Sequence, residues 1–223
     1  MDAKGAYLNG YLKESVYMRQ PDGYDDGTGH ICHLVKTLYG LKQARHEWNK
    51  VLDHKLKAKG FKPLLSDPCA YIRRNGEDLE IITVWVNDLL LFMNSNEKIT
   101  NLKVELNSMF DLTDIGESNK IVGIKITHCA NSSIFISQKQ YIKSILKREG
   151  MLNASPVKTP LDLKILLESN PEGEKGNRSN AFARLISSLQ YLSTATRPDI
   201  TYAVNQLSAY TANPSMAHYT AAK

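Results

Sequence analysis

The sequence predicts an α+β fold, an antiparallel sheet with helices packed on one face, followed by a helical region. Three observations indicate this class. Apolar stretches separated by tight-turn signals occupy residues 69–93, apolar side chains recur at helical spacing on both sides of them, and no internal repeat is visible. Strands joined by tight turns pair in antiparallel order, and flanking helices then cover one face of the sheet.

A hairpin is predicted around Asn75-Gly76. This dipeptide accepts positive φ at both central positions of a tight turn, so strands are expected near 69–73 and 79–86. A second tight turn at Asn87-Asp88, between two apolar runs, would add a third strand at 88–93. The three strands would form an antiparallel meander.

Two helices flank these strands. Residues 44–61 have apolar side chains at helical spacing, and Gly60 is suited to the C-cap. Residues 94–110 show a similar apolar face, with Asn94 or Ser95 suited to the N-cap.

The second half of the chain predicts more strands and then helices. Strands are expected at 120–127 and 133–137, and a helix at 140–150 that ends at Gly150. Residues 151–180 contain prolines and a polar run that cannot bury enough apolar surface to order itself, which predicts a flexible linker.

Two further helices close the chain. One has an apolar face from Phe182 to Leu192. The other opens on Thr196, with Pro198 in its first turn and Asp199 three positions past the cap, which resembles a capping box. It is expected to end before Asn213-Pro214.

The composition is ordinary for a globular protein of one large or two small domains. The 223 residues are 42% hydrophobic and 23% charged, and the net charge is +5. This basic balance permits a polyanionic partner without requiring one. No stretch approaches the roughly 20 apolar residues of a membrane span, and the N-terminus lacks a signal-peptide pattern. We therefore expect a soluble, intracellular chain with no membrane partner.

The cysteines and histidines do not form a recognisable zinc site. Cys32, Cys69 and Cys129 are far apart and form no CxxC pair, which disfavours a disulfide framework. The run "HICH" (30–33) and His128-Cys129 each supply two adjacent ligands but lack the remaining pair.

Four sequence runs carry a family likeness when they are taken together and in order. They are "MDAKGAYLNGYLKESVYMRQPDGY" (1–24), "LYGLKQARHEW" (38–48), "VWVNDLLLF" (84–92) and "TRPDITYAVNQLS" (196–208). The chain resembles the reverse transcriptase of copia-type LTR retrotransposons, the RNA-dependent DNA polymerase domain of their Pol polyprotein. The resemblance covers nearly the whole chain.

The resemblance implies a domain organisation that lacks most of the fingers. The expected parts are a palm (1–118) with a residual fingers insertion (about 8–36), a primer-grip hairpin and start of the thumb (119–150), the linker (151–180), and thumb or connection helices (181–223). Both ends look truncated, so Asp2 is expected to lie on a fraying terminus.

The resemblance also implies RNA-directed DNA synthesis with two Mg²⁺ ions held by carboxylates on adjacent strands. Asp2 matches the first of the family's Asp residues, although the bare sequence would suggest a solvated terminal acid. Trp85-Val86-Asn87-Asp88 occupies the place of the family's YVDD motif. The resemblance therefore assigns Asp2, Asn87 and Asp88 to the catalytic and metal-ligating positions.

Asn87 stands where the resembling family has an Asp whose negative charge holds the metal ions. It offers a neutral carbonyl oxygen in place of the carboxylate that bridges the two ions. We expect weakened Mg²⁺ binding and a crippled polymerase, so whether the chain is an enzyme stays open.

Further positions follow from the same resemblance. The nucleotide-binding candidates are Ala3, Tyr7, Gly40 and Gln43, and the nucleic-acid-binding candidates are Lys42, Gly123, Lys139, Lys143 and Lys147. The Tyr7 ring would lie beneath the incoming sugar and favour deoxynucleotides; a core aromatic is the alternative. The last three lysines share one helix face, which suits duplex phosphates or is simply the solvated face.

The implied partners are an RNA template, a DNA primer or hybrid duplex, and deoxynucleoside triphosphates. The rest of a Pol polyprotein, RNase H and integrase, is missing. The family implies the cytoplasm, with the nucleus as an alternative. Two rival functions are a non-catalytic nucleic-acid-binding remnant and a decayed gene product without a selected role.

Overall fold

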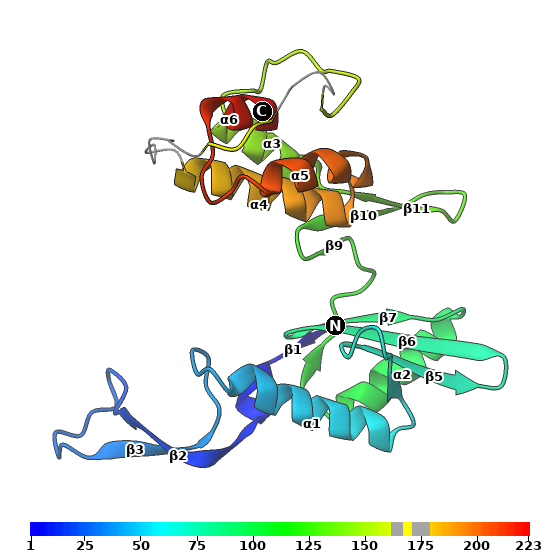
Figure 1. Ribbon diagram of the computed structural model, residues 1–223. Helices are drawn as coiled ribbons and strands as arrows, with labels where there is room; N and C mark the ends of the chain where they lie inside the picture. The colour runs from blue at the N-terminus through cyan, green and yellow to red at the C-terminus, as the bar shows by residue number, and fades with distance from the viewer. Residues whose placement is uncertain (162–166, 171–178) are drawn as a thin grey trace. The chain divides into compact units, whose positions relative to one another are not determined.

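The computed structural model describes residues 1–161, 167–170 and 179–223. The chain divides into two compact units, residues 1–117 and 118–223, and each is described by itself (Figure 1). Antiparallel sheets and helices occur in both units, so the α+β prediction is confirmed.

The first unit alternates strands and helices along residues 1–117. Its elements are β1 (Asp2–Ala3), the 3-10 helix η1 (Ala6–Asn9), β2 (Tyr11–Arg19), β3 (Ile31–Lys36), α1 (Ala44–Ala58), β4 (Lys62–Pro63), β5 (Ala70–Asn75), β6 (Asp78–Trp85), β7 (Asp88–Phe92), α2 (Asn96–Asn107) and β8 (Leu112–Thr113). Within this fully described unit, six strands form one sheet in the order β4-β5-β6-β7-β1-β8. The strand that comes first in the chain therefore lies between two that come much later.

Alternation along the strands gives this sheet one covered and one open face. Tyr71, Ile82 and Leu89 lie on the covered face and are at most 1% exposed. They pack with apolar side chains of the two helices, which are Trp48, Leu52 and Leu56 of α1 and Leu102 and Leu106 of α2. On the open face, Trp85 is 55% exposed. Both helices cover the same face because their apolar sides share one core (Figure 1).

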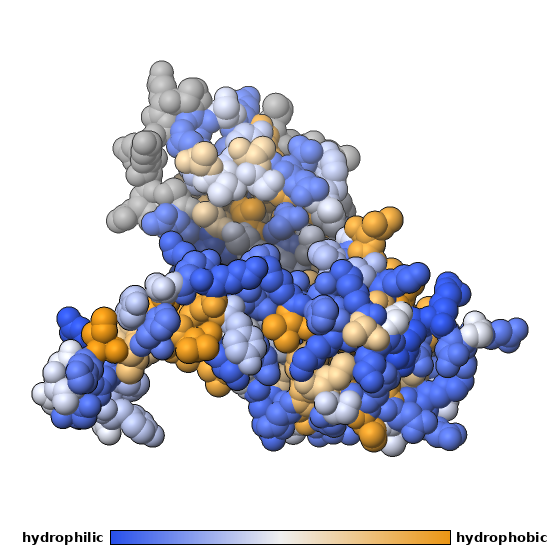
Figure 2. Space-filling view, turned by 90° about the horizontal axis from the view of Figure 1, so that it is seen from below, coloured by the Kyte–Doolittle hydropathy of each residue, from blue (hydrophilic) through white to orange (hydrophobic). Residues whose placement is uncertain are grey.

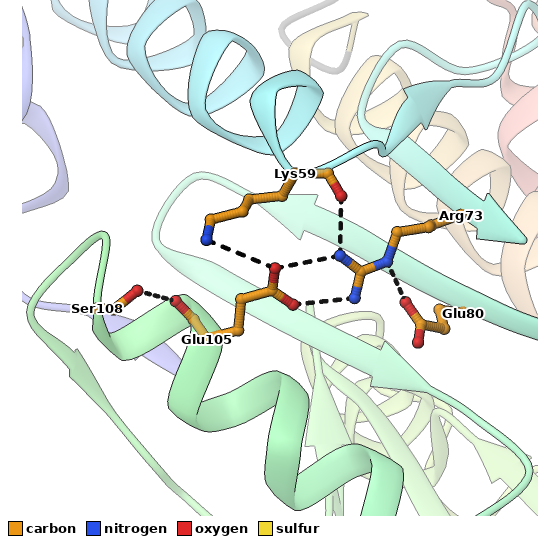
Figure 3. Close-up of polar contacts among 5 residues, drawn as sticks. All are labelled: Lys59, Arg73, Glu80, Glu105 and Ser108. Atoms are coloured by element: carbon orange, nitrogen blue, oxygen red, sulfur yellow. Dashed lines mark hydrogen bonds and ion pairs between the residues drawn. The ribbon is translucent and has the colours of Figure 1, made fainter. Parts of the chain in front are cut away.

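Arg73 connects the two helices to the sheet (Figure 3). Its guanidinium donates to the carboxylate of Glu105 on α2, at 3.2 and 2.9 Å, to Glu80 on β6, and to the Lys59 carbonyl at the end of α1, at 2.8 Å. It also lies 4.3 Å from the centre of the Phe61 ring. The hydrogen bonds from Arg73 lower the pKa of Glu105 below its ordinary value. Because one planar cation connects β6, α2 and the end of α1, its loss would weaken the attachment of both helices to the sheet.

Two glycines set chain reversals in the first unit. Gly60 has φ +83° after α1, and the N–H groups of Gly60 and Phe61 close back on Lys57 and Leu56, which is a Schellman motif. In the β5–β6 hairpin Asn75 pairs with Asp78, so the turn is Gly76-Glu77 and not Asn75-Gly76. Gly76 has φ +65°, whereas Glu77 does not adopt positive φ, so the turn needs only one such residue, at its first central position.

Strands β2 and β3 pair separately as a two-stranded ribbon that extends from the first unit (Figure 1). Ile31 and Val35 are 60% and 64% exposed on it, and Figure 2 shows apolar atoms on this arm. An isolated two-stranded ribbon buries little apolar surface and is marginal alone.

The second unit combines a small sheet with packed helices. Its elements are β9 (Lys120–Ile121), β10 (Ile124–His128), β11 (Ile134–Ser137), α3 (Lys139–Arg148), α4 (Ser179–Ala195), the 3-10 helix η2 (Pro198–Ile200), α5 (Thr201–Ser208) and α6 (Met216–Ala222). Its strands within the described residues follow the order β11-β10-β9. Ile145 of α3 packs with Leu185 and Leu192 of α4, and Phe182 and Ile186 of α4 pack with Leu207 of α5.

Several predictions for this unit are wrong in detail. Residues 120–127 are not one strand, because a tight turn at Val122-Gly123 divides them into β9 and β10. The capping box at Thr196 and Asp199 does not form: the Thr196 hydroxyl donates to Gln138 at 2.7 Å, and the Asp199 carboxylate accepts from Arg197. Thr196 therefore binds a residue 58 positions away, which only the folded chain brings near, and Asp199 binds its close neighbour Arg197.

The expected linker lies mostly between α3 and α4. Its residues 151–161 and 167–170 are in neither helix nor strand. Residues 162–166 and 171–178, on which the rest of that prediction falls, lie outside the described residues. In the described part of the chain, no helix is both long and apolar enough to cross a membrane.

Candidate functional site

Asp2 and Asp88 lie directly opposite each other on β1 and β7. The Ala3 N–H donates to the Asn87 carbonyl and the Leu89 N–H to the Met1 carbonyl, both at 2.8 Å. Because the ladder bonds flank the Asp2–Asp88 pair, it is a non-hydrogen-bonded pair, in which Cα atoms are about 4.5 Å apart and side chains are close. The two carboxylates therefore share one face of the sheet, side by side.

This face is the open one. Asp88 also pairs with Trp85 of β6, and Asp2 with Thr113 of β8, so the row Trp85, Asp88, Asp2 and Thr113 runs across four strands. Trp85 and Thr113 are exposed, and the two carboxylates are half-buried. The carboxylate pair is thus accessible on the side of the sheet that α1 and α2 leave uncovered.

The hairpin turn next to the pair consists of Val86 and Asn87, not Asn87 and Asp88 as predicted. Trp85 pairs with Asp88, so Asp88 is the first residue of β7. Val86 has φ +59°, which is an outlier for a β-branched residue. The indole Nε1 of Trp48 donates to the Val86 carbonyl at 2.7 Å and holds the turn in place.

The side chain of Asn87 closes the site. Its amide Nδ2 donates a hydrogen bond to Oδ1 of Asp2. The opposite orientation of the amide would bring two oxygen acceptors together, which is favourable only with a cation between them. The Asn87 N–H group therefore stabilises the negatively charged Asp2 oxygen, as a bound cation would otherwise do.

The donor set does not fit paired Mg²⁺ ions. Two adjacent dications need several anionic oxygens, and this site offers the carboxylates of Asp2 and Asp88 and one amide whose N–H faces the ligand position. Among the described residues, no group of three or more His, Cys, Asp or Glu side chains is placed to hold a metal ion.

Asp2 does not lie on a fraying terminus, so that prediction is wrong. The Met1 nitrogen donates to the Leu89 carbonyl at 2.8 Å, and Met1 is 9% exposed. Asp2 is paired on both sides, with Asp88 and Thr113. Backbone pairing on both edges of β1 fixes the position of the carboxylate.

Ala3 and Tyr7 follow Asp2 in the same unit. The Ala3 side chain lies in the core and is 2% exposed. The Ala3 backbone N–H donates to the Asn87 carbonyl. Tyr7 lies on η1, half-buried, with its ring 4.6 Å from that of Tyr39. The buried Thr37 hydroxyl donates to the Tyr7 carbonyl, which ties η1 to the segment before α1.

Gly40, Lys42 and Gln43 lie just before or at the start of α1. Gly40 is exposed, and no atom lies within 4 Å of where a Cβ would be. Lys42 is exposed, and Gln43 occupies the N-cap position without a side-chain capping bond. The first unit therefore has an exposed backbone at Gly40 and polar side chains at Lys42 and Gln43.

Gly123, Lys139, Lys143 and Lys147 belong to the second unit. Gly123 lies in the β9–β10 turn, where the Tyr191 hydroxyl donates to the neighbouring Val122 carbonyl. The three lysines are exposed on α3 at four-residue spacing. The structure therefore brings Asp2, Asn87 and Asp88 together, and places these four residues in a different unit.

Trp48 and Thr37 are positioning residues that the sequence did not indicate for the site. The sequence places Trp48 in the helix expected at 44–61 and at the end of the 38–48 motif without indicating its hydrogen bond, and it gives no signal for Thr37. A buried indole N–H needs an acceptor, which is the one signal that could have suggested a second role for Trp48. Nothing in the sequence identifies the acceptor as Val86.

Comparisons with known proteins agree on one family. The model of a family described as "Reverse transcriptase (RNA-dependent DNA polymerase)" matches residues 1–163. The chain is 38% identical over 232 residues to the Retrovirus-related Pol polyprotein from transposon TNT 1-94 of Nicotiana tabacum, covering all of this chain and 18% of that relative. It is 35% identical over 227 residues to the Pol polyprotein from transposon RE1 of Arabidopsis thaliana, covering 100% and 15%.

A relative from yeast shows weaker similarity. The Transposon Ty1-DR5 Gag-Pol polyprotein of Saccharomyces cerevisiae is 29% identical over 187 residues, covering 78% of this chain and 9% of the relative. The chain thus spans less than a fifth of the length of these polyproteins. No solved structure matches the chain significantly.

Proposed function

Because this chain belongs to the reverse transcriptase (RNA-dependent DNA polymerase) family and corresponds to part of a copia-type transposon Pol polyprotein, we propose that it is a polymerase segment that keeps the family's carboxylate pair but does not carry out nucleotidyl transfer. On this proposal, the first unit acts as the palm with a residual fingers ribbon, and the second as the primer grip and thumb.

The observation that carries the proposal is the hydrogen bond from Asn87 to Asp2. Family members use paired Mg²⁺ to activate the primer 3′-hydroxyl and to neutralise the leaving pyrophosphate. Here the neutral amide of Asn87 stands where the family has a carboxylate, and its N–H donates a hydrogen bond to the carboxylate of Asp2. Asp2 and Asp88 remain correctly opposed, so the geometry of the pair supports descent from a working site, and the amide supports its loss of activity.

The remaining candidate residues support nucleic-acid contact on this proposal. Ala3, Tyr7, Gly40 and Gln43 would face a deoxynucleoside triphosphate and the base pair it joins. Lys42 would contact the RNA template. Gly123 would approach the DNA primer, and the three lysines of α3 would approach duplex phosphates.

Primer extension on an RNA template with Mg²⁺ tests the proposal. Losing one electrostatic partner of a reacting centre costs about a hundredfold or more in rate, so we expect at least that deficit against an active copia-type enzyme assayed in parallel. Robust extension by the unaltered chain would refute the proposal.

A second candidate function is nucleic-acid binding without chemistry. The observation in its favour is the stripe of Lys139, Lys143 and Lys147, which are exposed and have no ion-pair partner among the described residues. Free lysines at four-residue spacing can neutralise phosphates at little desolvation cost.

A further inference from the structure

Strand β11 presents a free, apolar edge in the second unit. Among the residues that the structure describes, it pairs with β10 alone and ends the sheet order β11-β10-β9. Ile134, Phe135 and Ile136 are 62%, 61% and 47% exposed, and Figure 1 shows the β10–β11 hairpin extending away from the helices. Residues 129–138 contain no charged side chain. Proteins usually protect such an edge with charges, prolines or bulges, so its exposure calls for a partner.

The pairing of β10 with β11 determines which backbone groups of β11 point outward. The Cys129 N–H donates to the Ser133 carbonyl, so Ser133 and Phe135 direct their backbone groups toward β10. The Ile126 N–H donates to Asn119 on the opposite side, which agrees with this alternation. The N–H and C=O groups of Ile134 and Ile136 therefore point to the free edge.

The sequence of this strand together with the residue before it, Ser133, reads the same in both directions. Residues 133–137 are Ser-Ile-Phe-Ile-Ser. If two such strands pair antiparallel about Phe135, Ile134 lies opposite Ile136 of the other copy, and Phe135 lies opposite its own equivalent. The outward backbone groups of Ile134 and Ile136 then meet as hydrogen-bonded pairs, and the two Phe135 residues form a close non-hydrogen-bonded pair.

We propose that β11 pairs with β11 of a second copy of this chain, joining two three-stranded sheets into one continuous sheet about a two-fold axis. Such an interface is isologous, because each contact occurs twice. The Ile134 and Ile136 side chains of both copies gather on one face, and the two Phe135 rings contact each other on the other face. A second copy is the partner that fits, because the palindromic sequence pairs each side chain with an equivalent one and no charged residue opposes the contact.

The interface is short and should be weak. A few residue pairs bury less than the roughly 1,200 Å² of a standard interface, so we expect a weak dimer that forms only at high protein concentration. Sedimentation velocity of the full chain should show a monomer at low micromolar concentration and a growing dimer fraction at several hundred micromolar. A mass that stays monomeric over this range would overturn the proposal, and so would a continuous series of larger aggregates.

A charge at the two-fold axis should abolish the dimer. Phe135→Lys places two like charges in the closest pair of the interface, which opposes pairing. Val157→Lys is the matched control, because Val157 is an 81% exposed apolar residue of the same unit and lies outside the sheet. We expect Phe135→Lys to remain monomeric and Val157→Lys to dimerise like the unaltered chain. A dimer that persists in Phe135→Lys would contradict the register.

Disulfide trapping tests the register even if the lysine variant folds poorly. In a chain whose Cys32, Cys69 and Cys129 are replaced by Ser, Phe135→Cys should form a covalent dimer on mild oxidation, because a non-hydrogen-bonded pair brings Cα atoms within about 4.5 Å. Ile134→Cys is the control, because its own equivalent is diagonal and about 7–8 Å away. Equal cross-linking of both variants, or none of Phe135→Cys, would overturn the proposal.

Discussion

Asn and Asp side chains have nearly the same size and shape, yet at position 87 they differ in what they do to Asp2. Asn87 donates a hydrogen bond to the Asp2 carboxylate and so stabilises the pair without a metal. An Asp at this position would place a third negative charge beside Asp2 and Asp88, and that repulsion is what a cation would relieve.

The turn that presents Asn87 depends on Trp48. We expect Trp48→Phe to lower the free energy of unfolding of the first unit by about 1–3 kcal/mol, because the partly buried Val86 carbonyl loses its donor. Urea unfolding followed by tryptophan fluorescence measures this, since both tryptophans of the chain, Trp48 and Trp85, lie in the first unit.

Trp85→Phe is the matched control for that measurement. Trp85 is 55% exposed, so its replacement should cost less than about 0.5 kcal/mol. Equal effects of the two substitutions would contradict a special role for the Trp48 hydrogen bond.

The sequence motifs predict which residues belong to the candidate site, but not the hydrogen bonds between their side chains. Asp2, Asn87 and Asp88 were found through the motifs, and the structure brings them together. The hydrogen bond from Asn87 to Asp2 joins residues 85 positions apart. It depends on the strand register, which a local pattern does not contain.

Helices α1 and α2 are fastened to the sheet through Arg73. We expect Arg73→Met to destabilise the first unit by about 2–4 kcal/mol, because it leaves the largely buried Glu80 carboxylate without its cation and leaves Glu105 only the Lys59 ammonium, at 3.8 Å. Lys4→Met is the control: Lys4 pairs with Asp111, but both side chains are more than half exposed, so the change should cost under about 1 kcal/mol. The same fluorescence-detected unfolding compares them, and similar losses for both would contradict the account.

The capping of α6 should depend on pH. The ring Nδ1 of His218 accepts from the Ser215 N–H at 2.8 Å, and the Ser215 hydroxyl accepts from the His218 N–H. Burial lowers the pKa of His218. The unfolded chain therefore binds a proton more readily than the folded one, and stability falls as pH drops below about 6.5 toward the lowered pKa.

Hydrogen exchange of the α6 amides, corrected for intrinsic rates, should show faster opening at pH 5.5 than at pH 7.5. His218→Gln keeps a capping acceptor without a titrating ring. We expect it to open faster at both pH values and to lose most of the pH dependence. An unchanged pH dependence in His218→Gln would show that another group is responsible.

Element-level prediction succeeded where the signal was local. The ends of α1 and α3, each two residues before a glycine with positive φ (Gly60 and Gly150), follow from glycine and helical spacing. Thr196 and Asp199 gave a false capping box because a short motif does not exclude other partners. Helix α6 and its Ser215 cap were missed.

The salt dependence of nucleic-acid binding by the whole chain tests whether the α3 lysines contact phosphates. If the lysines of α3 contact phosphates, replacing Lys139, Lys143 and Lys147 by Gln should reduce the slope of log affinity against log salt by about 2–3. The control triple is Lys50, Lys57 and Lys103 to Gln, which removes the same charge from lysines already paired with carboxylates. Fluorescence anisotropy with a labelled RNA–DNA hybrid measures both, and equal slopes for the two triples would argue against the α3 stripe.

The α+β class was predictable because the hairpins and amphipathic helices are encoded by neighbouring residues. The position of β1 between β7 and β8 was not, since it requires pairing of residue 2 with residues 88 and 113. Family membership followed from the order of four motifs over the chain, which no single motif establishes.

Isothermal titration of the unaltered chain and of Asn87→Asp with Mn²⁺, repeated with Mg²⁺, tests directly whether the amide has taken the place of a cation. We expect no saturable binding by the unaltered chain at millimolar metal and at least about tenfold tighter binding by Asn87→Asp, because a carboxylate replaces an N–H donor beside Asp2 and Asp88. Tight, stoichiometric binding by the unaltered chain would contradict it.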